Sequence, residues 1–180
     1  MVIKMSKLEH IVKTSYGRRE LIKFMSGNDW YKNNNVESNF QQNNTPYSIT
    51  KRMIDKVDDI KNKSILIMFN LEFLETLIYI YGVDAKNITF IADTEVEKNM
   101  AECVYKVNTL FLTKDNHNVQ GIVAIMAKKT FDLIMSNPPY NRNIDIKILN
   151  EVVDLADELV IVHPSTWAID LKGKSKLYND

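Results

Sequence analysis

Short apolar segments alternate with helical patterns from residue 64 onward, and this alternation restricts the fold more than any other feature. Residues 64–69 are apolar after Ser64, as expected for a strand buried on both faces. Apolar residues at helical spacing follow up to Gly82, a residue type common at helix C-termini. Further strands are predicted at 87–92, 109–112, 131–135 and 159–162, and further helices at 95–107, 118–129 and 143–157. The pattern predicts an α/β fold with a doubly wound, mostly parallel sheet.

The first 44 residues follow a different pattern. Residues 7–25 predict one or two amphipathic helices broken near Gly17, and the Asn- and Gln-rich residues 26–44 predict a loop. Thr45-Pro46 then suits a helix N-cap followed by proline at the first helical position, which predicts a helix to about residue 60. We therefore divide the chain into an N-terminal segment, 1–44, and a larger domain, 45–180.

Composition favours an ordinary globular protein. Hydrophobic residues make up 45% of the 180 residues and charged residues 26%. Lys plus Arg and Asp plus Glu both total 23, whereas proteins that contact nucleic-acid phosphates usually carry a basic surplus. A basic face must therefore be local, and residues 1–26 are the best candidate. They contain Lys4, Lys7, Lys13, Arg18, Arg19 and Lys23 against Glu9 and Glu20.

The sequence also bears on the cellular location of the protein and on whether it binds a metal. No apolar run approaches the roughly 20 residues that span a bilayer, and the first residues lack the apolar block of a signal peptide. Cys103 is the single cysteine, which excludes an internal disulfide and a cysteine-based metal site. None of the three histidines has neighbours in sequence that suggest metal or nucleophilic chemistry. We expect a cytoplasmic protein without a bound metal.

The stretch Asn137-Pro138-Pro139-Tyr140, at the end of the predicted strand 131–135, carries the clearest chemical signal. The Asn137 side chain offers a carbonyl acceptor and an amide donor. Two prolines fix φ and supply no N–H, so the Pro138 carbonyl is held in a stiff extended loop. Tyr140 adds an aromatic face. Two acceptors beside a stacking surface suit a planar group that bears an exocyclic amino group.

The segment Phe-Asp-Leu-Ile-Met-Ser-Asn-Pro-Pro-Tyr-Asn, residues 131–141, resembles motif IV of the S-adenosylmethionine-dependent N6-adenine DNA methyltransferases, enzymes of restriction–modification systems. The resemblance covers about residues 45–168. It implies the strand order 3-2-1-4-5, S-adenosylmethionine as methyl donor, and a flipped-out adenine of DNA as acceptor. Asn137, Pro138, Pro139 and Tyr140 would form the catalytic loop.

The resemblance also implies cofactor-binding positions, which are Thr45, Pro46, Phe69, Asn70, Glu72, Asp93 and Asp115. Thr45-Pro46-Tyr47 resembles motif X, Asp93 stands where an acid binds the ribose hydroxyls, and Asp115 where an acid contacts the adenine amino group. The loop at 69–73 corresponds to motif I but has no glycine, so its side chains should narrow the methionine pocket and positive φ becomes costly. Helix capping is an alternative role for Asn70, for Asp93 and for the Thr45-Pro46 pair, with Glu72 as a first-turn acid.

Other interpretations remain open. Only residues 165–180 follow the fifth predicted strand, whereas the family sheet has two further strands. The chain is therefore a piece of a longer enzyme, or it covers the edge of the fifth strand by self-association or with a partner subunit. A protein glutamine methyltransferase is the second enzyme hypothesis, because a similar motif binds a planar amide. The third is a non-catalytic binding protein or subunit that retains the fold.

Overall fold

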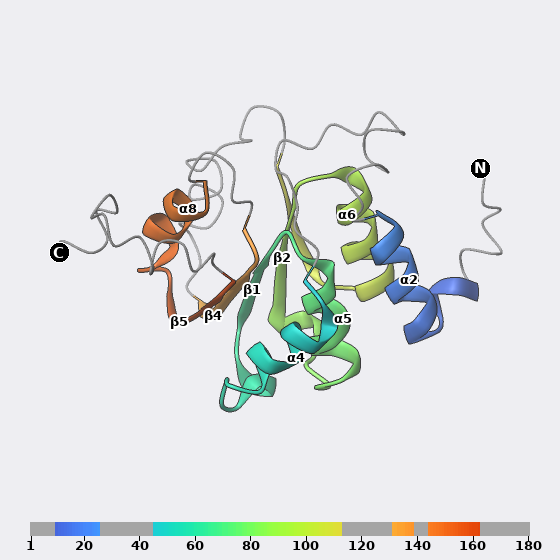
Figure 1. The fold of residues 1–180 in the computed structure, drawn as a ribbon, viewed down its shortest axis with the longest axis horizontal. Coiled ribbons are helices and arrows are strands. Elements are labelled where there is room, and N and C mark those ends of the chain that lie inside the picture. Colours follow the sequence, from blue (N-terminus) through green and yellow to red (C-terminus); the bar gives the residue numbers. More distant parts are fainter. Residues whose placement is uncertain (1–9, 26–44, 113–130, 139–143, 163–180) are drawn as a thin grey trace.

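The computed structural model describes residues 10–25, 45–112, 131–138 and 144–162, and these form a parallel sheet flanked by helices (Figure 1). The strands are β1 (Ile65–Met68), β2 (Ile88–Ala92), β3 (Asn108–Phe111), β4 (Phe131–Ser136) and β5 (Ala156–Ile161). They lie in the order β3-β2-β1-β4-β5, and each neighbouring pair is parallel. The predicted α/β, doubly wound fold is confirmed, including the strand order. The helix predicted at 118–129 lies outside the described residues.

The helices follow the predicted segments with shorter bounds. They are α2 (Ser15–Met25), α4 (Tyr47–Ile54), α5 (Leu71–Tyr79), α6 (Glu95–Asn99), which continues as a π-helical segment (Met100–Tyr105), and α8 (Ile144–Val152). Short 3-10 turns occupy Ile60–Asn62 and Ala85–Asn87. Gly82 has a φ of 68°, so the chain turns after α5 through a left-handed residue as predicted. In contrast, the helix predicted to reach residue 60 ends at Ile54.

The sheet separates two apolar clusters because side chains of a strand alternate between its faces. Ile65 and Ile67 of β1 belong to the cluster that also contains residues of α2, α4, α5 and the π-helical segment. Leu66 and Met68 belong to the other cluster, which includes Ile148 and Val152 of α8. All four β1 residues are fully buried, as the unbroken apolar run predicted. Among the described residues, no helix is long and apolar enough to cross a membrane.

Gly17 does not mark the break between the N-terminal helices, contrary to the prediction. The turn lies at residues 13–14, and Gly17 is inside α2. The Thr14 hydroxyl accepts a hydrogen bond from the Gly17 N–H at 3.0 Å and so caps α2. A Cβ at Gly17 would lie 2.0 Å from the Ile11 carbonyl oxygen. Glycine is therefore required for close packing of the preceding turn.

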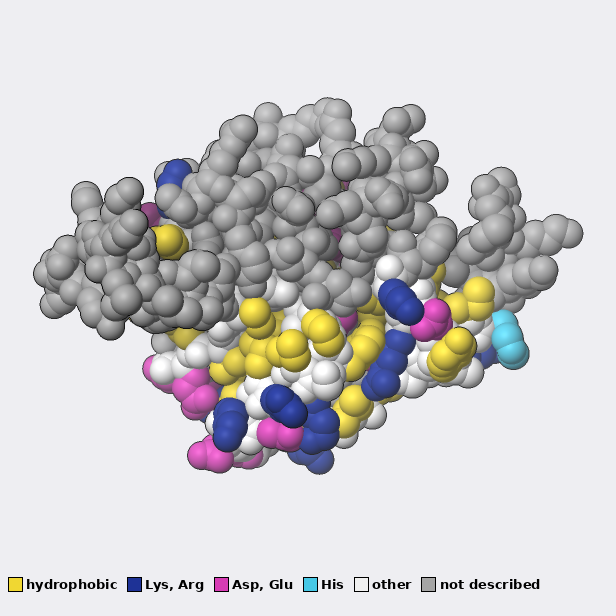
Figure 2. All heavy atoms as spheres, viewed as in Figure 1, with side chains coloured by type: hydrophobic (Ala, Val, Ile, Leu, Met, Phe, Trp, Pro, Cys, Tyr) yellow, Lys and Arg dark blue, Asp and Glu magenta, His cyan; other side chains and the backbone are white. Residues whose placement is uncertain are grey.

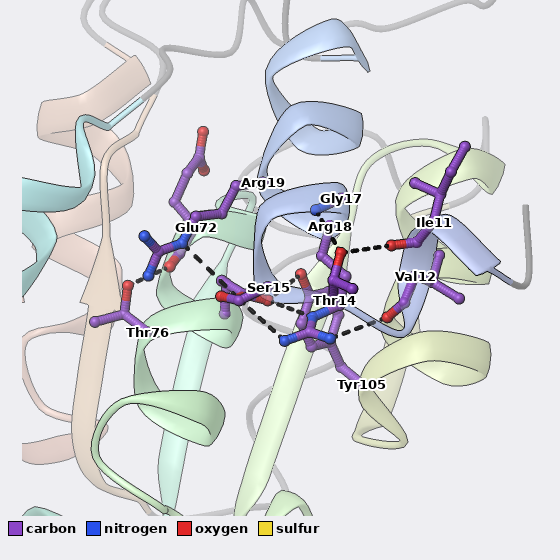
Figure 3. A network of polar contacts seen from close by, with 11 residues as sticks. Ile11, Val12, Thr14, Ser15, Gly17, Arg18, Arg19, Glu72, Thr76 and Tyr105 are labelled. Atoms are coloured by element: carbon purple, nitrogen blue, oxygen red, sulfur yellow. Dashed lines mark hydrogen bonds and ion pairs between the residues drawn. The ribbon is translucent and has the colours of Figure 1, made fainter.

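Two arginines of the predicted basic face serve the fold instead (Figure 3). Arg18 is buried and donates from Nε to the Glu75 carboxylate of α5 at 2.7 Å. Its guanidinium carbon lies 3.5 Å from the ring centroid of Tyr79. Arg19 stacks over Tyr47, with its guanidinium carbon 4.5 Å from that ring centroid. The hypothesis that Arg18 faces a nucleic acid is wrong, because an arginine buried in an ion pair cannot contact phosphates. Among the described residues on the face in Figure 2, both Lys or Arg and Asp or Glu side chains are visible.

A groove of about 550 Å³ runs between α4 and β5. Strand β5 is the last of the sheet among the described residues, and its inner neighbour is β4. The groove is lined by Ile49, Arg52, Met53, Lys56, Leu159, Val160, Ile161 and Val162. Residues at the end of the fifth strand therefore form one wall of the groove, and Arg52 and Lys56 are basic residues on the other wall.

Candidate functional site

The carboxyl ends of β1 and β4 meet at the point where the strand order reverses. The chain continues from β1 to β2 on one side, whereas β4 lies on the other side of β1. Met68 and Ser136, the last residues of these two strands, are paired in the register. The loops that begin at residues 69 and 137 consequently leave the sheet side by side. In open α/β sheets this switch point is where ligands bind.

Phe69 turns the chain after β1 through a left-handed conformation, with a φ of 70°. Such a conformation costs a residue with a side chain roughly 1–2 kcal/mol. Phe69 is buried in the apolar cluster of the α8 face, and burial of a phenylalanine contributes about 1.5–3 kcal/mol. The loop without glycine therefore still adopts positive φ, because burial of the ring offsets the cost. The costly positive φ expected for this loop is therefore present, at Phe69.

Three polar residues from separate segments are joined at this switch point. The Asn70 side-chain oxygen accepts a hydrogen bond from the backbone N–H of Asn137 at 2.8 Å. The Asn137 side-chain amide donates to the Thr45 hydroxyl at 2.9 Å. All three residues are buried, with 5% exposure or less. The structure thus brings together residues predicted separately for the cofactor side and for the acceptor side.

Neither Thr45 nor Asn70 uses its side chain to cap a helix. Pro46 occupies the N-cap position of α4, and its carbonyl accepts from the N–H groups of Ile49 and Thr50. The predicted Thr45 cap with proline at the first helical position is therefore wrong by one residue. Asn70 does occupy the N-cap position of α5, but its side chain makes no capping bond there. Both side chains are directed to Asn137 instead.

Glu72, in the first turn of α5, adds an acid to this cluster. It is 3% exposed, and its carboxylate accepts from the backbone N–H of Thr45. Its Oε1 atom has no hydrogen-bond partner among the described residues. Burial, opposed by the backbone hydrogen bonds, raises the pKa of Glu72 to about 7. A buried carboxyl oxygen without a partner is suited to receive a cationic or hydrogen-bond-donating group of a ligand.

The raised pKa makes the stability of the protein depend on pH. Between the ordinary value of 4.5 and about 7, the native state binds the Glu72 proton more tightly than the unfolded chain does. The free energy of unfolding should fall by about 3 kcal/mol as pH rises through this window. Glu72→Gln cannot titrate, and we expect it to lose this part of the pH dependence.

Urea denaturation at pH 5 and pH 8 measures the effect. The matched control is Glu151→Gln, which removes an exposed carboxyl on α8 and should retain the wild-type difference between the two pH values. Parallel pH profiles for wild type and Glu72→Gln would show that the carboxyl does not titrate in this window.

Asp93 follows β2 directly and is 1% exposed. Its hypothetical capping role is wrong, because Thr94 is the N-cap of α6. The Thr94 hydroxyl accepts from the N–H of Glu97, whose carboxylate accepts from the N–H groups of Asp93 and Thr94. Since β2 and β1 are parallel neighbours, Asp93 and Asn70 both lie at the carboxyl ends of the strands. The structure leaves the predicted ribose contact untested.

The remaining predicted site residues divide into two groups. Pro138 is buried and follows Asn137 directly after β4, and Pro46 is the N-cap of α4. Asp115, Pro139 and Tyr140 lie outside the described residues, so their predicted roles remain predictions.

The pairing of Arg19 with Tyr47 was not anticipated from the sequence. Burial, followed by the carboxylates of Glu72 and Glu75, raises the pKa of Tyr47, so its phenol stays neutral. The Tyr47 hydroxyl and the Arg19 Nε are buried without a hydrogen-bond partner among the described residues. No sequence pattern indicates this pair, because it depends on how α2 lies against α4.

Comparison with protein-family models, with curated proteins and with solved structures gave no match. Among the described residues there is also no group of His, Cys, Asp and Glu that could hold a metal ion. The site combines the amide groups of Asn70 and Asn137 and the hydroxyl of Thr45 with the titratable carboxyl of Glu72. Such a set can bind and orient a polar ligand.

Proposed function

We propose that this chain binds S-adenosylmethionine and transfers its methyl group to the N6 amino group of adenine in DNA. One observation carries the proposal, namely the hydrogen-bonded cluster of Asn70, Asn137 and Thr45 at the switch point of the sheet. It joins the three segments that resemble the cofactor and acceptor motifs of the adenine methyltransferases. A donor–acceptor reaction requires those segments to be adjacent.

The residues present fit the cofactor at two points. The buried Glu72 Oε1 atom, which has no hydrogen-bond partner within the described part of the chain, complements the ammonium group of the methionine part. Asp93, at the end of β2, would accept hydrogen bonds from the two ribose hydroxyls, and the resemblance assigns Asp115 to the adenine ring. S-adenosylmethionine, when bound, supplies an electrophilic methyl group on a sulfonium ion.

On the acceptor side, this chain would orient the target amino group. Its nitrogen is a poor nucleophile because the lone pair is delocalised into the ring. The side-chain carbonyl of Asn137 and the backbone carbonyl of Pro138 would accept its two hydrogens, which favours a tetrahedral nitrogen with its lone pair directed at the methyl group. Pro139 would stiffen the loop, and stacking on Tyr140 would contribute about 1–3 kcal/mol. That stacking offsets the few kcal/mol needed to flip the base out of the duplex.

Calorimetric titration of the full chain with S-adenosylmethionine is the first test. If only ionised Glu72 binds the ammonium group, affinity should be about tenfold lower at pH 6 than at pH 8. Glu72→Gln should weaken binding at pH 8, whereas the exposed control Glu151→Gln should not. No binding at either pH would contradict both enzyme hypotheses for this chain.

Transfer of labelled methyl groups is the second test. We expect incorporation into unmethylated DNA and none into DNA whose adenines are already methylated. Incorporation into a protein amide instead would support the glutamine methyltransferase hypothesis. Binding of cofactor without transfer to either substrate would support a non-catalytic binding protein.

A further inference from the structure

Asn137 is held at two points, its backbone N–H and its side-chain amide, by residues that need not touch a substrate. The Asn70 side-chain oxygen accepts a hydrogen bond from the backbone N–H of Asn137 at 2.8 Å, and this bond holds the main chain directly after β4. Thr45 receives the side-chain amide of Asn137 at 2.9 Å, and this bond holds the end of the side chain. The contacts join positions that are 67 and 92 residues apart in the chain.

The direction of the hydrogen bond to Thr45 determines which atom of the Asn137 amide can accept a hydrogen bond from a target amino group. The nitrogen and oxygen of a planar amide point about 120° apart, so a nitrogen directed at Thr45 turns the oxygen away from it. An acceptor for the hydrogens of a target amino group must be this oxygen. In the structure the nitrogen is the amide atom directed at the Thr45 hydroxyl, so the oxygen faces the other way.

From these contacts we propose that Thr45 and Asn70 are positioning residues, which set the position of the Asn137 backbone and of its side-chain amide for the reaction. This inference rests on the proposed function, but its geometric part can be tested without any activity. Thr45 also donates its backbone N–H to the Glu72 carboxylate. The same residue therefore contacts both the acid assigned to the cofactor and the amide assigned to the target.

Nuclear magnetic resonance of the ¹⁵N-labelled full chain tests the geometry. The side-chain amide signals of Asn137 can be assigned by their loss in Asn137→Asp. Thr45→Val should accelerate hydrogen exchange of this side-chain amide at least tenfold and leave the backbone N–H of Asn137 unchanged. Asn70→Ala should accelerate exchange of the backbone N–H instead. Unchanged exchange in both variants would overturn the inference.

Steady-state kinetics tests the consequence for transfer. Thr45→Val should lower kcat about tenfold to a hundredfold with little change in the KM for DNA, because misplacement of a reacting group acts on the chemical step. Thr45→Ser keeps the hydroxyl and should restore most of the rate. Asn70→Asp keeps the acceptor oxygen and should exceed Asn70→Ala in rate.

The outcomes separate the two hypotheses. A wild-type kcat in Thr45→Val, or a loss that serine does not restore, would overturn the positioning role. If the two variants show the expected changes in hydrogen exchange but the wild-type chain transfers no methyl group, the proposed function is contradicted. The positioning of Asn137 by Thr45 and Asn70 is then still supported.

Discussion

Asn137→Ala is expected to reduce methyl transfer to DNA to the background rate, a loss of at least about a hundredfold. The substitution removes the side-chain carbonyl proposed to accept a hydrogen of the target amino group, and removal of one such oriented group typically costs two to three orders of magnitude. Transfer of labelled methyl groups under single-turnover conditions measures the effect. S-adenosylmethionine should still bind, because the cofactor contacts are assigned to other residues.

The substitution also removes the contact with Thr45, so stability must be measured beside activity. We expect a loss of about 1–3 kcal/mol, because the buried Thr45 hydroxyl loses its partner. Asn150→Ala is the matched control, since it removes the same side chain from an exposed position of α8. A folded Asn137→Ala chain with wild-type transfer would exclude Asn137 from the reaction.

The sheet could be predicted from the sequence because each strand has a local signal. The run at 65–68 is apolar at every position, and Gly82 marks the turn after α5 because glycine adopts positive φ readily. Phe69 shows the limit of such signals. Its positive φ is maintained by burial against residues distant in the chain, so neither its residue type nor its neighbours indicate it.

The candidate site could be predicted only in part, for a related reason. Asn137 and Asn70 were identified as separate motif positions, but their hydrogen bond depends on the pairing of β1 with β4. The sequence alone does not separate two roles of Thr45, because Thr-Pro suits both a helix cap and a contact with a distant residue, and only the folded chain excludes the cap. Arg18 was assigned to a basic face because sequence cannot reveal that Glu75, 57 residues later, neutralises it in the core.

That buried network around Glu75 leads to the largest expected effect on stability. The Glu75 carboxylate is fully buried and accepts from Arg18 Nε, from the Tyr105 hydroxyl at 3.1 Å, and from the Ser15 hydroxyl. The contacts tie α2 and the π-helical segment to α5 (Figure 3). Glu75→Ala would leave the Arg18 guanidinium buried without its counter-charge. We expect the free energy of unfolding to fall by about 3–5 kcal/mol.

Urea denaturation of Glu75→Ala measures this loss, and Asp55→Ala provides the control. Asp55 forms an ion pair with Lys51 at 2.7 Å, but both side chains are about half exposed, so its removal should cost no more than about 1 kcal/mol. The double variant Arg18→Met/Glu75→Leu should be more stable than Glu75→Ala, because it removes the buried charge together with its partner. If the double variant is no more stable than Glu75→Ala, the loss does not come from an unpaired arginine. The loss would then come from the hydrogen bonds that Ser15 of α2 and Tyr105 of the π-helical segment donate to Glu75, which both variants lack.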